Sequence, residues 1–315
     1  MAARHGCPAL LLTALLTALL SACEAGGGLT PPPELPKIES GLIAADGTHL
    51  AASRWEAQEP TAIVLALHGY GDHADSTFAL AGARWASSGL TTIAFDQRGF
   101  GRNPSRSYWP GAEALISDLR AVSGQVRRQW PCLPLAVLGH SMGGGVVLGA
   151  APDLDADGLI LAAPAIWGGT QLNPFHRLAA WTAASIAPEK RFTGRGVVRI
   201  QASDNVEMLG ALARDPLYLR PPSAREIWGL VRVTDKAEAA AVEVATPALL
   251  LLGEKDQILP ERSVRRVFER LTGPRTVIAY PDGWHLLFRD LQAERVWTDV
   301  ANWVSRLPVP DGCAG

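Results

Sequence analysis

The sequence predicts an α/β fold in which a mostly parallel central sheet is covered by helices on both faces. From about residue 62 onward, short apolar runs alternate with longer amphipathic stretches, and the connections between them are short. Such alternation is typical of parallel strands joined by helical crossovers. The 315 residues, of which 48% are hydrophobic, are enough to bury a substantial core, so we expect one large domain with an insertion.

A hairpin is expected to open the folded part of the chain. Residues 42–44 and 50–55 flank Asp46-Gly47, a pair that is typical of a tight primed turn. After the hairpin, apolar runs predict strands and amphipathic runs predict helices. The predicted strands are 62–67, 91–95, a strand beginning at 135, 159–162, 248–253 and 276–280, and the predicted helices are 76–87, 112–129, one opening at about 142, 262–271 and 293–306.

The regular alternation stops between residues 164 and 246. This stretch has helical character and contains Trp167, Trp181 and Trp228. It is too long for a simple connecting loop, and it falls where the sheet would otherwise continue. We therefore predict a helical cap insertion, at about 164–246, within a domain that spans residues 39–310.

The N-terminus reads as a targeting segment. Arg4 supplies a charged start, residues 8–20 are almost wholly apolar, and small residues lead to Cys23. The segment resembles a bacterial lipoprotein signal, which implies cleavage after residues 1–22, lipid attached to Cys23 and a Gly/Pro-rich tether at 23–38. We then expect an exported, membrane-anchored protein facing the periplasm or the cell exterior, although an ordinary secretory peptide and an uncleaved anchor remain open.

Charge and cysteine content restrict the partners further. The formal net charge is −2 and no long basic run is present, which excludes the electrostatic footprint of a nucleic-acid-binding protein. Beyond the N-terminal segment only Cys132 and Cys313 remain. Export would place them in an oxidising environment, but the sequence leaves their pairing open.

The strongest chemical signal is the serine at the end of the strand that begins at Leu135. Residues 139–143 read Gly-His-Ser-Met-Gly, with an apolar strand before them and a glycine-rich helix start after them. This is the G-x-S-x-G nucleophile elbow, in which a sharp turn exposes the serine hydroxyl at a helix N-terminus. We therefore predict that Ser141 is a nucleophile.

A serine nucleophile needs a histidine base. On a sheet of this type the residues follow the order serine, acid, histidine, and only His176 and His285 follow Ser141. His285 comes after the last predicted strand, at the edge of the sheet where sites gather, whereas His176 lies in the insertion. We predict His285 as the base.

The acid that orients this histidine is expected at the same edge of the sheet. Asp256 follows the predicted strand 248–253, so strand-end placement and chain order both favour it. Glu254 and Asp282 are the alternatives.

Two backbone N–H groups are expected to form an oxyanion hole. The residue after the nucleophile, Met142, supplies one, and the loop after strand 62–67 should supply the other. Tyr70, between Gly69 and Gly71, is the candidate there.

No metal or other cofactor is expected. His68, Asp72 and His73 share the same loop, but their spacing matches no recognised metal site.

These motifs together resemble those of α/β-hydrolases over residues 39–306, and within them the monoacylglycerol lipase and lysophospholipase-like group that is also called serine aminopeptidase S33. The resemblance implies ester hydrolysis through an acyl-enzyme, with Ser141 as nucleophile, His285 as base and Asp256 as its orienting acid. It also implies an oxyanion hole of the Tyr70 and Met142 N–H groups. The group often has Glu where Asp72 stands and His where Phe100 stands. The motifs lie at residues 68–73, 96–101, 139–143 and 253–260 and in the loop of His285.

The expected substrate is a small ester or a single-chain lipid, monoacylglycerols and lysophospholipids being implied by the resemblance. Apolar and aromatic residues of the insertion would line an acyl groove or form the insertion's own core. Arg191, Arg195 and Arg199 are either a phosphate site or a solvated charged face. A peptidase or amidase with the same triad, and a non-catalytic membrane-tethered binding protein, are the rival hypotheses.

Overall fold

The computed structural model describes residues 41–192, 200–218, 221–310 and 312–313. The proposed signal at 1–22, Cys23 and the tether at 23–38 lie outside the described residues, as do Arg195 and Arg199. Among the described residues, no helix has the length and apolar character needed to cross a membrane.

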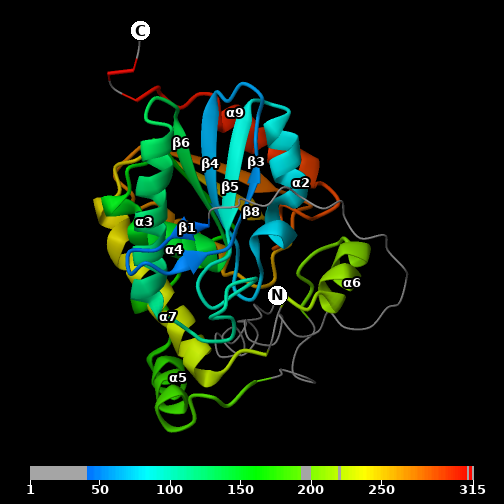
Figure 1. The fold of residues 1–315 in the computed structure, drawn as a ribbon. Helices are drawn as coiled ribbons and strands as arrows, with labels where there is room; N and C mark the ends of the chain where they lie inside the picture. The colour runs from blue at the N-terminus through cyan, green and yellow to red at the C-terminus, as the bar shows by residue number, and fades with distance from the viewer. Residues whose placement is uncertain (1–40, 193–199, 219–220, 311, 314–315) are drawn as a thin grey trace.

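A seven-stranded sheet forms the centre of the molecule (Figure 1), with the strand order β3-β5-β4-β6-β7-β8-β9. Strand β3 pairs antiparallel with β5, and all other neighbouring strands in this sheet are parallel. The predicted mostly parallel sheet is therefore confirmed. The strands are β3 (Ala52–Trp55), β4 (Ala62–Leu67), β5 (Leu90–Phe95), β6 (Leu135–His140), β7 (Gly158–Ala162), β8 (Ala248–Gly253) and β9 (Arg275–Tyr280).

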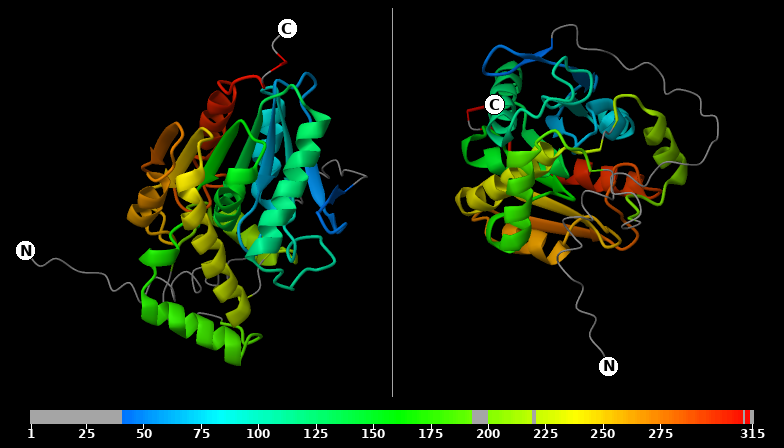
Figure 2. Two further views of the ribbon diagram at one scale, coloured as in Figure 1. Left: turned by 90° about the vertical axis from the view of Figure 1, so that its left-hand side faces the viewer. Right: turned by 90° about the horizontal axis from the view of Figure 1, so that it is seen from below.

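Helices cover both faces of this sheet, which explains why its central strands are mostly apolar and buried on both sides (Figures 1 and 2). All residues of β4, β5, β6 and β8 are buried, as expected for parallel strands that have no solvent-facing side. One face is covered by α2 and α9, which contact each other, and the other by α3, α4 and α7 (Ala224–Ala240). The core helices are α2 (Ala74–Ala86), α3 (Ala112–Gln129), α4 (Met142–Ala150), α8 (Glu261–Phe268) and α9 (Ala293–Val304).

The predicted hairpin forms, but the prediction of a primed turn is wrong. Strands β1 (Leu42–Ile43) and β2 (His49–Leu50) pair antiparallel. The Gly47 N–H donates to the Ala44 carbonyl, and only Gly47 in the turn has a positive φ, +82°. A primed turn needs positive φ at residues such as Asp46, whereas a turn closed by one left-handed glycine bulge does not. The predicted strand 50–55 also divides, because β3 leaves β2 and joins the large sheet.

The chain between β7 and β8 contains α5 (Pro174–Ile186), α6 (Val206–Arg214) and α7 (Ala224–Ala240). Helix α7 packs against α4 of the core, while α5 contacts α7 and lies farther from the sheet (Figure 2). Several large apolar side chains of α5 face solvent. They are Phe175, Leu178, Trp181 and Ile186.

A disulfide joins Cys132 to Cys313. It links the end of the described chain to the loop that precedes β6. The structure thus pairs the two cysteines, whereas the sequence left their pairing open.

Candidate active site

Ser141 stands between β6 and α4 in a conformation that non-glycine residues rarely adopt, with φ 53° and ψ −118°. The turn is possible because the adjacent chain comes very close. A Cβ atom at Gly139 would lie 2.3 Å from the Gly143 carbonyl oxygen, and one at Gly143 would lie 2.5 Å from the Leu67 carbonyl oxygen. Glycine at both positions is therefore a packing requirement, and the strained serine is the feature expected of a nucleophile elbow.

The structure brings Ser141, His285 and Asp256 together. The His285 Nε2 atom lies 3.0 Å from Ser141 Oγ, and its Nδ1 atom lies 2.8 Å from Asp256 Oδ2. The other carboxylate oxygen, Oδ1, accepts hydrogen bonds from the N–H groups of Ile258 and Leu259, at 2.7 and 3.1 Å. An ionised carboxylate can only accept, so Nδ1 carries the imidazole proton and Nε2 is free to take the serine proton.

The alternatives to these residues lie elsewhere. Asp282 is exposed and pairs with Lys255 at 2.6 Å, and the lysine lowers the pKa of its carboxyl. Glu254 is exposed at the strand end, and His176 lies on α5. The three residues that come together instead follow β6, β8 and β9, whose carboxyl ends meet at one edge of the sheet.

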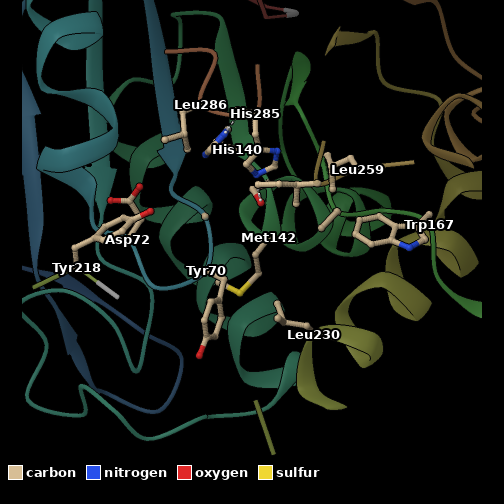
Figure 3. Close-up of a pocket in the computed structure, with 14 residues that line it drawn as sticks. Tyr70, Asp72, His140, Met142, Trp167, Tyr218, Leu230, Leu259, His285 and Leu286 are labelled. Carbon is tan, nitrogen blue, oxygen red and sulfur yellow. Dashed lines mark hydrogen bonds between the residues drawn. The ribbon is translucent and has the colours of Figure 1, made fainter. Parts of the chain in front are cut away.

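Tyr70 and Met142, the two predicted oxyanion donors, both line the pocket that contains Ser141 (Figure 3). Met142 is the first residue of α4, so its N–H belongs to the unpaired first turn of the helix. A Cβ atom at Gly69 would lie 3.1 Å from the Ser141 Cβ, which shows how closely the loop after β4 approaches. The Tyr70 ring itself points away from His285 and packs against Phe100 and Trp109.

Two buried histidines support this arrangement. The His140 Nε2 donates to the backbone carbonyl of His285 at 2.9 Å, and burial, with the adjacent His285, lowers the pKa of His140 to about 3. The His68 Nε2 accepts from the Gln97 N–H at 2.8 Å, so its Nδ1 donates to the Gly69 carbonyl at 2.7 Å. Burial lowers the pKa of His68 as well. Both rings are therefore neutral hydrogen-bonding groups that fix loops of the site.

The polar residues of the loop after β4 form ion pairs. Asp72 and Arg289 are both buried and lie 2.5 Å apart, and although burial opposes it, the arginine keeps the pKa of Asp72 low. His73 Nε2 lies 2.8 Å from Asp215, just beyond α6, which raises the pKa of His73 against the effect of burial. Within the described ranges, no group of three or more His, Cys, Asp or Glu side chains could hold a metal ion.

A solvent-open pocket with about 500 Å³ of empty space lies over Ser141. Trp167, Leu230 and Leu259 line an apolar part, while Asp72 and Tyr218 lie close together at another side of it (Figure 3). The sequence predicted that apolar and aromatic residues of the insertion could line an acyl groove, but it did not single out Tyr218 or Leu230. Only the tertiary fold brings these residues to the serine.

Comparison with known proteins identifies the family of this chain. The family model described as serine aminopeptidase, S33 matches residues 58–292, well over half of the chain. The chain belongs to this family of serine hydrolases. The resemblance seen in the sequence, to α/β-hydrolases of the monoacylglycerol lipase group, is thereby confirmed.

Several relatives of this S33 serine hydrolase match nearly end to end. A monoacylglycerol lipase from Mycolicibacterium smegmatis is 28% identical over 280 residues, covering 85% of this chain and 97% of the relative. The human monoglyceride lipase is 24% identical over 284 residues, covering 87% and 92%. The crystal structure of the Paleococcus ferrophilus monoacylglycerol lipase, at 22% identity, covers 82% of this chain and 98% of that one with a TM-score of 0.69, and it shows the shared α/β-hydrolase fold.

Proposed function

We propose that this enzyme hydrolyses carboxylic esters of single-chain lipids, monoacylglycerols or lysophospholipids, through a Ser141–His285–Asp256 triad. The observation that carries the proposal is the hydrogen-bonded series from Asp256 through His285 to Ser141, placed below a mainly apolar pocket. The names of the S33 relatives, which are monoacylglycerol lipases, support the same substrate class.

The geometry supports a two-step reaction. His285 Nε2 takes the proton of Ser141 as its oxygen attacks the ester carbonyl, and the N–H groups of Tyr70 and Met142 stabilise the oxyanion. The imidazolium then gives its proton to the leaving alcohol, and an acyl-enzyme remains. Water, deprotonated by the same histidine, releases the fatty acid and restores the serine. Asp256 holds the imidazole in the required tautomer throughout.

The pocket supports the lipid assignment. Trp167, Leu230 and Leu259 present an apolar surface to an acyl chain, because its burial there removes apolar area from water. Asp72 and Tyr218 offer hydrogen-bonding groups where an alcohol leaving group would lie. Arg191 donates to the Pro221 carbonyl through Nη1 and lies 3.6 Å from Glu226, so part of its charge is already paired within the protein.

A substrate panel tests the proposal. Purified protein and Ser141→Ala are assayed on a monoacylglycerol, a lysophosphatidylcholine, a short 4-nitrophenyl ester and an aminoacyl amide. We expect hydrolysis of at least one of the two lipids, and its loss of at least 10³-fold in the serine variant. Activity on short esters alone would contradict the lipid assignment, and preference for the amide would favour the peptidase alternative.

We further propose that the enzyme is an exported lipoprotein held on a membrane by lipidated Cys23 after removal of residues 1–22. The disulfide between Cys132 and Cys313 suits an oxidising compartment, and the exposed apolar side chains of α5 suit a lipid surface. Mass spectrometry of protein isolated from cells tests this, because the N-terminal peptide should begin at a diacylglyceryl-modified Cys23. An unmodified Cys23 would favour an ordinary secretory peptide.

A further inference from the structure

The turn that carries His285 contains a buried carboxylate for which the proposed reaction has no use. Asp290 lies in this turn, between β9 and α9, and is 3% exposed. Its Oδ2 atom accepts a hydrogen bond from the N–H of Trp284, the residue directly before His285, at 2.7 Å. Its Oδ1 atom accepts from the hydroxyl of Ser203 at 2.6 Å, and Ser203 is fully buried in the insertion. One side chain therefore joins the backbone beside the histidine to the insertion.

Residues 202–205 of the insertion bind the same turn at further points. The Leu286 N–H, directly after His285, donates to the Ala202 carbonyl at 3.0 Å. Asn205 donates through Nδ2 to the Arg289 carbonyl at 3.0 Å and also caps the first turn of α6. The backbone on both sides of His285 is thus fixed by groups outside the triad, and these groups continue into the helix that leads to the pocket wall at Tyr218.

We propose that Asp290 is a positioning residue for His285, and that through Ser203 it makes the geometry of the triad depend on the docking of residues 202–205. The inference rests on the proposed function. It follows from the small tolerance of such sites, because an imidazole displaced by about 1 Å from its serine can lose about 100-fold in rate. Asp290 reaches neither the pocket nor the reacting atoms, so it acts through the backbone of the turn.

The ionised carboxylate is the form that can hold both donors. Burial raises the pKa of Asp290 to about 6, against the hydrogen bonds of Ser203 and Trp284, and the charge of Asp204 adds to the increase. The other titratable group that faces it is His285 on its own turn. Protonation would convert one acceptor oxygen into a donor, which either reverses the hydrogen bond with the Ser203 hydroxyl or breaks the one with the Trp284 N–H. Part of the loss of activity on the acid side should therefore come from protonation of Asp290.

The test compares Asp290→Asn and Ser203→Ala with the unmodified protein and with Asp299→Asn. Asp299 is a matched control, since it is a carboxylate on neighbouring α9 that accepts from the Tyr280 hydroxyl at 3.1 Å and does not touch the His285 turn. For each protein, kcat and KM for 4-nitrophenyl butyrate are measured from pH 4.5 to 8.5, and folding is checked by circular dichroism. Ser141→Ala is assayed in parallel.

We expect Asp290→Asn to lower kcat about tenfold with KM changed less than twofold. On the acid side, the activity of Asp290→Asn should fall less steeply with pH than that of the unmodified protein and of Asp299→Asn, because the variant lacks the protonation of Asp290. Ser203→Ala should lower kcat in the same direction by a smaller factor. If Asp290→Asn does not fold, Ser203→Ala decides, with a reduced kcat supporting the inference and an unchanged kcat overturning it.

An inactive Ser141→Ala beside a folded Asp290→Asn that keeps the kcat and the acid-side pH dependence of the unmodified protein would overturn this inference alone. A Ser141→Ala variant that retains activity would overturn both the proposed function and the inference.

Discussion

At the scale of single residues, folding shifts the pKa values of two histidines near the site in opposite directions. His140 is buried beside His285 and has its pKa lowered to about 3. His73 Nε2 contacts Asp215, which raises the pKa of His73 against the effect of burial. A histidine of the unfolded chain titrates near pH 6.5. These two residues should therefore make opposite contributions to the pH dependence of stability.

His140 should make the protein less stable as the pH falls below about 6.5. Between that value and about 3 the unfolded chain binds a proton at this position and the folded chain does not, so the free energy of unfolding decreases towards acid. The slope is at most about 1.4 kcal/mol per pH unit for one proton. We expect His140→Gln to show a shallower decrease between pH 6.5 and 4.5 in urea unfolding. An unchanged slope would contradict a neutral, buried His140.

His73 should behave in the opposite way. Because its folded pKa is raised, its ionic stabilisation is fully present below about pH 6.5 and is lost as the pH rises through the folded value. His73→Asn keeps a residue that caps helices well and removes the charge. We expect the stability difference between the protein and this variant to be larger at pH 5.5 than at pH 9. An equal difference at both values would show that the contact with Asp215 carries no protonation-dependent energy.

At the scale of secondary structure elements, two glycines within helices differ in whether helix propensity or side-chain packing decides the effect of an alanine substitution. Glycine within a helix costs roughly 1 kcal/mol relative to alanine. In α3, a Cβ at Gly124 would approach only the flexible end of Arg128, at 3.4 Å. In α7, a Cβ at Gly229 would lie 2.1 Å from the Trp109 indole, which packs beside Tyr70.

We therefore expect Gly124→Ala to raise the free energy of unfolding by about 0.5–1 kcal/mol. Gly229→Ala should lower it by about 1–3 kcal/mol, because overpacking exceeds the gain in propensity. Denaturant unfolding of both variants checks the pair. A stabilised Gly229→Ala would mean that α7 does not contact Trp109 as closely as described.

The element boundaries show which features the sequence encodes locally. Apolar runs and glycine-rich turns were enough to predict β4, β8 and α3 almost to the residue, since burial on both faces leaves a continuous apolar signal. The Asp46-Gly47 turn was predicted wrongly, because a short pattern does not distinguish a primed turn from a glycine bulge. Here the Asp46 carboxylate is held by Arg98, a residue far along the chain.

The residues of the site also divide into those that the sequence predicts and those whose positions depend on tertiary contacts. Ser141, Asp256 and His285 could be selected from motif, chain order and strand ends, and the structure brings them within hydrogen-bonding distance. Asp290, Ser203 and Tyr218 could not, because their positions depend on how the insertion docks on the turn after β9. No periodicity or spacing in the sequence describes that contact.

At the scale of the whole molecule, the disulfide between Cys132 and Cys313 closes a loop over a sequence separation of 181 residues. Cross-linking so long a loop restricts the unfolded chain, and loss of such a bond typically costs 2–5 kcal/mol. We expect the Cys132→Ser, Cys313→Ser double variant to unfold at lower temperature while its activity at 25 °C is unchanged, since Cys132 precedes β6 and Ser141 follows the opposite end of this strand. Equal unfolding temperatures would show that the bond does not form in solution.

The central claim is that this fold presents an activated serine to an ester substrate. Labelling with a fluorophosphonate probe, followed by identification of the modified peptide by mass, tests it most directly because the probe reacts with a serine only when a base activates it. We expect modification at Ser141 in the folded protein and none in Ser141→Ala. A correctly folded protein that remains unlabelled, or that is labelled equally in Ser141→Ala, would contradict the account.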